Sequence, residues 1–261
     1  MEPWTILVIG LLILGISTPL WTTVGLLRRI GELQNASSPR HLARRAESTV
    51  TPDQVAVLIA AHNEELVISE TIASALMLVP AGNIHVISDG SSDNTAAIAN
   101  AAGVNCLELF PNRGKAGALA AGIEYFDLVN NYEVMLLLDA DTRLTPDYLK
   151  TGLPLFAAPD VVAVAGRAKS LPDRGRRNPV ARILLTYRER LYTAVQLLLK
   201  YGQASGPANV VNIVPGFASM YRTRILPEVD VAAPGLLIED FNMTFEVHAK
   251  KLEGHIEILD E

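Results

Sequence analysis

Short apolar runs alternate with helical patterns over the middle of this chain. The apolar runs occupy residues 55–61, 84–88, 104–109 and 134–138, and helical patterns lie between them at 64–79, 93–102 and 115–128. Short apolar runs bounded by polar turns are typical of buried strands. Their alternation with helices predicts a parallel sheet covered by helices on both faces, and therefore an α/β fold.

Length, charge and cysteine content narrow the class of protein. The chain has 261 residues, enough for one sizeable α/β domain and an appendage, and its formal net charge is −6. A negative net charge disfavours a nucleic-acid-binding surface, so we expect no nucleic-acid partner. Cys106 is the single cysteine, which excludes a disulfide within the chain. Its apolar neighbours indicate a buried thiol in a reducing compartment.

The N-terminal run from Trp4 to Leu27 contains no charged residue. As a helix it would extend roughly 36 Å, which is enough to cross a hydrocarbon core of about 30 Å. A cleaved signal peptide is the alternative, but no basic residue precedes the run. The sequence therefore predicts one uncleaved transmembrane helix, within an anchor of residues 1–28.

Basic residues follow this run on one side only. They are Arg28, Arg29, Arg40, Arg44 and Arg45, whereas the opposite flank carries an acidic residue. Because positively charged flanks stay in the cytoplasm, we expect a cell-membrane protein with its N-terminus outside and the rest of the chain inside. Membrane lipids with anionic headgroups are partners for the same arginines. Residues 29–52 are predicted to be a basic juxtamembrane linker.

A polar group follows each of the four predicted strands. These groups are residues 62–65, 89–93, 112–117 and 139–141. Ligands of parallel sheets bind at the carboxyl ends of the strands, so we expect the four groups to surround one site. Two carboxylates, Asp139 and Asp141, lie where a strand leaves the core. Their partial desolvation costs free energy unless a cation pairs with them. A Mg²⁺ or Mn²⁺ ion bound to a diphosphate fits two such carboxylates, and a solvated turn is the alternative.

Two of these polar groups have features of a nucleotide pocket. Asp89, at a strand end, can accept a hydrogen bond from a nucleobase, whereas Ser92 and Asp93 suit helix capping. Residues 112–117 form a glycine-containing loop that enters a helix, and Lys115 adds positive charge to it. The backbone N–H groups of such a loop, together with the helix N-terminus that follows, can bind phosphate. Neither the Walker spacing nor G-x-G-x-x-G is present, which argues against a dinucleotide fold.

Two helical patterns lie beyond residue 145. Residues 179–201 form a long pattern with an apolar stripe, which we interpret as a helix packed on the core, with a membrane-surface helix as the alternative. Residues 241–250 form a shorter amphipathic pattern, and Asp240 precedes it. Asp240 is either the N-cap of that helix or a general base that removes a proton from an acceptor hydroxyl.

Six segments in this order resemble family 2 glycosyltransferases with the GT-A fold. They are residues 57–65, 88–95, 112–119, 139–141, 215–222 and 238–240. The last two are similar to the membrane-bound branch of that family, which contains hyaluronan, chitin, cellulose and poly-N-acetylglucosamine synthases. The resemblance covers roughly residues 53–250. It implies a GT-A domain in residues 53–261, with a Rossmann-like, mostly parallel sheet flanked by helices and preceded by the transmembrane helix.

The resemblance also implies roles for individual positions. On the donor side it implies nucleotide binding by Ala60, Asn63, Glu64, Asp89, Lys115, Asp139 and Asp141, with the metal ion on Asp141. On the acceptor side it implies a border formed by Gly216, Phe217 and Glu239. Asp240 would be the catalytic base.

The expected activity is an inverting, metal-dependent transfer of a hexosyl or N-acetylhexosaminyl group. The donor would be a nucleotide-diphosphate sugar, expected to be a UDP-sugar, and the acceptor a hydroxyl of a carbohydrate, a lipid-linked glycan or another molecule at the cytoplasmic membrane face. Both tryptophans, Trp4 and Trp21, lie in the N-terminal run, so the Gln-x-x-Arg-Trp motif of the processive synthases is absent. That absence indicates a C-terminally truncated chain or one that adds a single sugar. The alternatives are a membrane-tethered sugar-nucleotide-binding protein without turnover and a nucleotidyltransferase.

Overall fold

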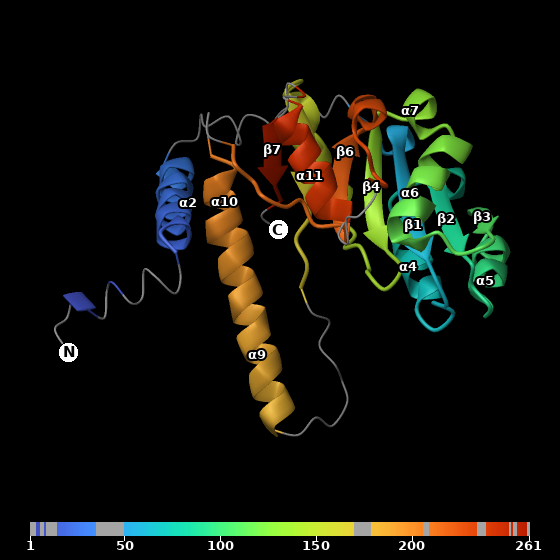
Figure 1. Cartoon of the computed structure of the whole chain (residues 1–261), viewed down its shortest axis with the longest axis horizontal. Coiled ribbons are helices and arrows are strands. Elements are labelled where there is room, and N and C mark those ends of the chain that lie inside the picture. The colour runs from blue at the N-terminus through green and yellow to red at the C-terminus, as the bar shows by residue number, and fades with distance from the viewer. Residues whose placement is uncertain are drawn as a thin grey trace.

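A seven-stranded sheet organises the part of the chain that the computed structural model describes, namely residues 4–5, 8, 15–34, 50–169, 179–205, 209–233, 239–250, 252 and 255–259. The strand order is β3-β2-β1-β4-β6-β5-β7 (Figure 1). The strands are β1 (Val55–Ala61), β2 (Ile84–Asp89), β3 (Asn105–Leu109), β4 (Val134–Asp139), β5 (Val161–Ala165), β6 (Ala218–Arg222) and β7 (His255–Ile258). The four strands predicted from the alternating pattern, β1 to β4, are confirmed.

The sheet is mostly parallel. β1 pairs in parallel with β2 and β4, and β2 pairs in parallel with β3. β6 runs antiparallel to both of its neighbours, β4 and β5, whereas β7 is parallel to β5. The predicted parallel sheet is therefore interrupted by one reversed strand, which the alternating pattern did not indicate.

Helices cover both faces of this sheet. They are α4 (Ile68–Leu76), α5 (Thr95–Ala101), α6 (Gly114–Tyr125), α7 (Leu128–Asn131), α8 (Tyr148–Gly152) and α11 (Glu239–Ala249). Alternate strand residues point to opposite faces, so Val57 and Ile59 join one buried cluster and Ala56 and Leu58 the other. The two clusters form the two halves of the hydrophobic core.

The first predicted helix starts later than expected. Residues 64–79 were predicted to be helical, but α4 begins at Ile68. The residues before it form a turn in which Asn63 has a left-handed backbone, with φ of 57°. This turn is held by hydrogen bonds to the loop after β2, so the polar group that follows β1 belongs to a loop rather than to the helix.

A long helical column extends away from the sheet at its α9 end (Figure 1). It consists of α9 (Pro179–Ala194), a π-helical segment η4 (Val195–Lys200) and α10 (Tyr201–Gln203). The helix predicted over residues 179–201 is confirmed, but its apolar stripe is exposed at Ile183, Leu184 and Tyr187, each more than 60% accessible. The core-packing interpretation is therefore wrong for the first half of this helix.

The helix α2 (Ser17–Gln34) lies beside α10 (Figure 1). It contains the second half of the predicted anchor and continues through Arg28 and Arg29, so the first residues of the predicted linker are helical. Residues 6–7, 9–14 and 35–49 lie outside the described ranges. Among the helices that the structure describes, none combines the length and the apolar character that a bilayer crossing requires.

Candidate active site

The carboxyl ends of β1, β2 and β4 meet at one edge of the sheet. Asp139 is the last residue of β4, and in the β1–β4 register it pairs with Ala60. Asp89 is the last residue of β2, one strand farther along the sheet. The parallel pairing thus brings these three predicted donor-side residues to the same edge.

The loops after β1 and β2 are joined through Asn63. The backbone N–H of Ser92 donates to Asn63 Oδ1 at 2.8 Å, and the backbone N–H of Asn63 donates to Ser91 Oγ at 3.1 Å. The backbone N–H of Glu64 donates to Thr95 Oγ1 at 2.8 Å. Asn63 is therefore a connector between two loops, and its predicted contact with the nucleotide stays a prediction.

Asp89 fixes the glycine-containing loop after β3. It is 2% exposed, and its Oδ1 accepts the backbone N–H of Arg113 at 2.7 Å. Its carbonyl accepts Asn112 Nδ2 at 2.8 Å. The next residue, Gly90, has φ of 65°, and a Cβ there would lie 2.9 Å from the Cβ of Asn112, so a side chain cannot be added without moving the loop. Asp89 and Gly90 together determine where the loop ends and α6 begins.

Lys115, in the first turn of α6, connects the two predicted sides of the site. Its Nζ lies 2.7 Å from Asp139 Oδ1 and 2.6 Å from Glu239 Oε1, the first residue of α11. Burial lowers the pKa of Lys115, but the hydrogen bonds and charges of the two carboxylates outweigh burial and raise it. The ammonium group is therefore charged at neutral pH and holds β4, α6 and α11 together.

A cavity of about 260 Å³ opens beside Lys115. Its lining residues are Arg113, Gly114, Lys115, Ala116, Val231, Ala233, Glu239 and Asn242. The N-terminal turn of α6 and the first turn of α11 thus face one space. This space combines Arg113, Lys115 and the positive end of α6 with the Glu239 carboxylate that pairs with Lys115, so an anionic ligand there would share Lys115 with Glu239.

Carboxylates gather on the strand side of the same region. The pKa of Glu64 is raised by burial and by the charges of Asp141, Asp93 and Asp139. The pKa of Asp139 is also raised, because burial and the charges of Asp141 and Glu239 outweigh the opposing effect of Lys115. The negative charge of Asp141 thus acts on both Glu64 and Asp139, and a cation bound beside these carboxylates would offset it.

The same carboxylates are the candidates for metal binding. Within the described ranges, no group of three or more His, Cys, Asp or Glu side chains is arranged to hold a metal ion. Asp139 and Asp141 offer two hard oxygen ligands, so the donor set fits Mg²⁺ or Mn²⁺ only with further oxygens from a bound ligand such as a diphosphate.

Asp240 is the second residue of α11, and both of its carboxylate oxygens accept backbone hydrogen bonds. Oδ2 accepts the N–H of Gly216 at 3.1 Å, and Oδ1 accepts the N–H of Phe241 at 2.9 Å. Thr244 Oγ1 donates to the carbonyl of Asp240 at 2.8 Å and accepts the N–H of Val214 at 2.8 Å. These bonds attach the start of α11 to the segment that leads into β6.

Gly216 is the point where the predicted donor and acceptor sides meet. A Cβ added to it would lie 3.2 Å from Lys115 Nζ, 3.5 Å from Glu239 Oε1 and 3.7 Å from the Cβ of Asp240. Phe217, the other predicted acceptor residue, is partly buried and packs against the core cluster that contains Val57. The structure thus brings Gly216, Lys115, Glu239 and Asp240 into contact distance and places Phe217 against the core.

Several residues that shape this site were not predicted. Asn112 holds the carbonyl of Asp89, Thr95 holds the backbone of Glu64, and Thr244 ties Asp240 to Val214. Asn112 and Thr95 lie inside segments that the family resemblance covered, so the resemblance could have indicated them. Thr244 lies inside a helical pattern, and nothing in the sequence indicated its role.

Comparison with known proteins identifies the family. The family model described as glycosyl transferase family 2 matches residues 56–229. The chain therefore belongs to glycosyl transferase family 2, as the six segments predicted.

Poly-beta-1,6-N-acetyl-D-glucosamine synthase of Staphylococcus epidermidis is 30% identical over 200 residues, which cover 74% of this chain and 45% of the relative. The Staphylococcus aureus (strain COL) protein of the same name is 28% identical over 202 residues, 75% of this chain and 46% of the relative. The chain spans about half the length of these curated relatives.

Solved structures support the GT-A-like fold. The mannosyltransferase PcManGT from Pyrobaculum calidifontis, in complex with GDP-Man and Mn²⁺, has a TM-score of 0.55 and 17% identity over 92% of this chain and 66% of its own. Glucosyl-3-phosphoglycerate synthase from Mycobacterium tuberculosis, in complex with UDP, has a TM-score of 0.50 and 18% identity over 84% of this chain and 72% of its own. At these identities the likeness concerns the fold, and it confirms the predicted α/β architecture with a mostly parallel sheet.

Proposed function

We propose that this chain transfers a sugar from a nucleotide-diphosphate donor to a hydroxyl acceptor, with inversion at the anomeric carbon. The observation that carries the proposal is the Lys115 ammonium group, which pairs with Asp139 and Glu239 beside one cavity. Lys115 and Asp139 lie on the donor side, and Glu239 precedes Asp240 on the acceptor side. Membership of glycosyl transferase family 2 supports the same reaction class.

The donor we propose is a UDP-sugar, with an N-acetylhexosamine as the transferred group. The relatives at 28–30% identity are named poly-beta-1,6-N-acetyl-D-glucosamine synthases, which supports that sugar. In this proposal Ala60, Glu64 and Asp89 hold the base and ribose, and Asn63 keeps their loops together. The positive end of α6, with Lys115, receives the diphosphate.

Asp240 is proposed to act as the general base. The acceptor hydroxyl attacks the anomeric carbon, its proton passes to the Asp240 carboxylate, and the bond to the diphosphate oxygen breaks with its electron pair on the leaving group. Two backbone N–H groups orient this carboxylate before the acceptor arrives. Lys115 stabilises negative charge that develops on the leaving group. A Mg²⁺ or Mn²⁺ ion on Asp141 and Asp139 would neutralise the same charge when bound.

We also propose that the N-terminal run anchors the chain in a membrane, with the catalytic face in the cytoplasm. The uncharged stretch from Trp4 to Leu27 and the arginines after it support this proposal. Resistance of the membrane-bound chain to extraction by alkaline carbonate would support it, and complete extraction would contradict it. Protease cleavage from the outer side only would contradict the proposed orientation.

The catalytic proposal is tested with Asp240→Asn. We expect UDP release from a UDP-N-acetylhexosamine to fall about 10²- to 10⁴-fold, because that is the usual contribution of a general base. The calorimetric affinity for UDP with Mn²⁺ should stay within about twofold, since Asp240 is not proposed to touch the nucleotide. Asp53→Asn, at an exposed aspartate in the turn before β1, is the matched control. Full activity of the Asp240→Asn variant would refute the base assignment.

The metal assignment is tested with Asp141→Ala. The variant should lose the Mn²⁺-dependent part of UDP affinity in the same titration, while its metal-independent affinity remains. An unchanged titration would contradict the role of Asp141. If the wild-type chain binds UDP with Mn²⁺ but releases none from any UDP-sugar, the proposal of turnover is wrong and a sugar-nucleotide-binding protein is favoured.

A further inference from the structure

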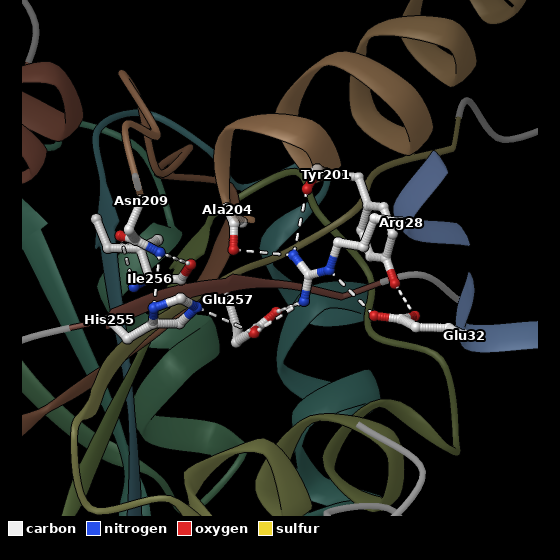
Figure 2. A network of polar contacts seen from close by, with 8 residues as sticks. All are labelled: Arg28, Glu32, Tyr201, Ala204, Asn209, His255, Ile256 and Glu257. Atoms are coloured by element: carbon white, nitrogen blue, oxygen red, sulfur yellow. Dashed lines mark hydrogen bonds and ion pairs between the residues drawn. The ribbon is translucent and has the colours of Figure 1, made fainter. Parts of the chain in front are cut away.

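Arg28 attaches the N-terminal helix α2 to the end of the helical column. Its guanidinium group donates to the carbonyls of Tyr201, at 3.2 Å, and Ala204, at 2.9 Å (Figure 2). It also pairs with Glu32 of α2 at 3.0 Å and with Glu257 of β7 at 3.1 Å (Figure 2). The column and α2 are therefore joined to each other and to the edge strand of the sheet.

The side of α2 that meets the column is polar, and its outer side is apolar. Arg28 lies on the inner side, as does Gly25, where an added Cβ would lie 2.1 Å from the carbonyl oxygen of Leu198. Leu20 and Leu27 lie away from this contact, and each is more than half exposed. A helix that packs on a domain in water normally buries its apolar side. The reversed arrangement favours an apolar medium on the outer side of α2.

The first half of the same column exposes a second apolar stripe. It belongs to α9, which extends from the column away from the sheet (Figure 1). The stripe is formed by Val180, Ile183, Leu184 and Tyr187, which recur at helical spacing and are each more than 60% exposed. Two helices that Arg28 holds together thus both leave apolar side chains outside.

A row of basic and polar side chains runs beside the stripe of α9. Arg182, Thr186 and Arg190 follow one another at intervals of four positions, so they lie on one face of the helix. Together with Ile183 and Tyr187 they line a hollow of about 570 Å³. Within the described ranges, no hydrogen bond or ion pair of the Arg182 or Arg190 guanidinium group is found. The hollow therefore offers two unpaired cations next to apolar surface.

Positive charge is concentrated around this helix although the chain as a whole is acidic. Between Asp173 and Arg190 the sequence contains six arginines and two acidic residues, whereas the formal net charge of the chain is −6. Basic amphipathic helices are typical of segments that lie on anionic membrane surfaces. Arginine stems follow apolar surface while their charged ends stay in the polar layer, and tyrosine suits the same boundary.

We propose that α9 is a second membrane contact, whose apolar stripe enters the headgroup boundary of an anionic bilayer while Arg182 and Arg190 bind lipid phosphates. A guanidinium group matches a phosphate through two parallel hydrogen bonds. A second copy docked α9 against α9 would place arginines against arginines, so a lipid surface fits the charge better. The inference goes beyond the proposed N-terminal anchor and does not depend on glycosyl transfer.

The test places the environment-sensitive fluorophore NBD on α9 of the full chain, through Ile183→Cys in a Cys106→Ser background. The chain is reconstituted with vesicles of phosphatidylcholine, alone or mixed with phosphatidylglycerol. Met77→Cys in the same background, at an exposed apolar residue that follows α4, is the matched control. We expect brominated lipids to quench the label at position 183 in the anionic vesicles and to leave the label at position 77 unquenched.

The arginines are tested with Arg182→Gln/Arg190→Gln in the chain labelled at position 183. The ratio of lipid-inserted to free label in anionic vesicles should fall about 25-fold, since each arginine near an anionic surface contributes roughly a factor of five. Lys150→Gln/Arg224→Gln removes two other exposed basic side chains and should change this ratio by less than about twofold. Urea unfolding of each variant checks that it is folded.

Four results would overturn the proposal. An unquenched label at position 183 in anionic vesicles would show that α9 stays in water. Quenching that depends neither on phosphatidylglycerol nor on the two arginines would show that they do not bind lipid phosphates. An emission change that follows the protein-to-lipid ratio and resists brominated lipids would identify a second copy as the occupant. Chains that do not float with the vesicles would contradict this contact and the N-terminal anchor together, whereas an unquenched label in a chain that resists alkaline carbonate would contradict the α9 contact alone.

Discussion

Stability below pH 6.5 is predicted to depend on His85, a buried histidine near the start of β2. The residue is 3% exposed, and its ring centre lies 4.5 Å from that of Phe126. Asn105 Nδ2 lies 3.3 Å from His85 Nδ1, and the Tyr132 hydroxyl lies 3.2 Å from Nε2. Because Asn105 Nδ2 can only donate, Nδ1 is an acceptor and the ring is neutral, with its proton assigned to Nε2.

Burial lowers the pKa of His85 from 6.5 to about 4. Between these two values the unfolded chain binds a proton that the folded chain does not, so stability is fully present above pH 6.5 and is lost as the pH falls toward 4. Integrating this single proton gives a loss of about 2 kcal/mol at pH 5 and about 3 kcal/mol at pH 4. Such a loss is a large part of the stability of an ordinary domain.

The assay is urea unfolding of the wild-type chain and of His85→Gln at pH 7, 6, 5 and 4. Gln keeps a polar group near Tyr132 but does not titrate. The raised pKa values of Glu64 and Asp139 act with the opposite sign and are present in both proteins, so the difference between them isolates His85. The difference in free energy of unfolding between the wild-type chain and His85→Gln should shift in favour of the variant as the pH falls. Parallel stability curves would refute the reasoning.

Three further predictions concern packing and charge. Arg28→Ala should lower the free energy of unfolding by about 2 kcal/mol, since it removes ion pairs with two partly buried carboxylates and two hydrogen bonds to backbone carbonyls; urea unfolding measures this, and an unchanged free energy of unfolding would contradict a stabilising role of Arg28. Gly166→Ala should lower the free energy of unfolding by about 3 kcal/mol, because its Cβ would lie 1.4 Å from the carbonyl oxygen of Ala218. Gly82→Ala, with open space around its Cβ, should lower it by less than about 1 kcal/mol, and thermal unfolding measures both. Lys115→Met should weaken UDP affinity about tenfold by calorimetry, and an unchanged affinity would show that the ammonium group does not face the diphosphate.

The meeting of the predicted donor-side residues at one edge of the sheet could be predicted because its determinants are local. Each polar group follows its own strand directly, and parallel pairing then brings the strand ends together without further information. Asp89 and Asp139 are examples, since each is the last residue of a strand that was predicted from its own apolar residues. The hydrogen bonds that fix the loops, such as Asn63 to Ser92, join segments that the alternating pattern already placed side by side.

The reversed strand could not be predicted in the same way. β6 is a short segment whose partners are β4 and β5, and its register with β4 pairs Leu138 with Ala218. A five-residue run does not reveal the direction in which it pairs, because the alternation of side chains is the same in both directions.

The N-terminal helix shows how a correct local observation can miss a tertiary role. Residues near Arg28 are basic and follow an apolar run, which indicates the flank of an anchor. In the folded chain, however, Arg28 reaches Glu257, which lies 229 residues away, and two backbone carbonyls of the α10 region. Periodicity and flanking charge carry no information about a partner at that separation, so the prediction described the surroundings of Arg28 but not its contacts.

Contacts between separate segments also fix the start of α11 and the position of α10. Asp240 is positioned by Gly216 and Thr244. The helix α10 is held by Arg28 and by the close approach of Gly25 and Gly202 to the neighbouring helix. If the N-terminal run lies in a membrane, as we propose, then the helix that holds α10 in place and the attachment to the membrane are one continuous segment.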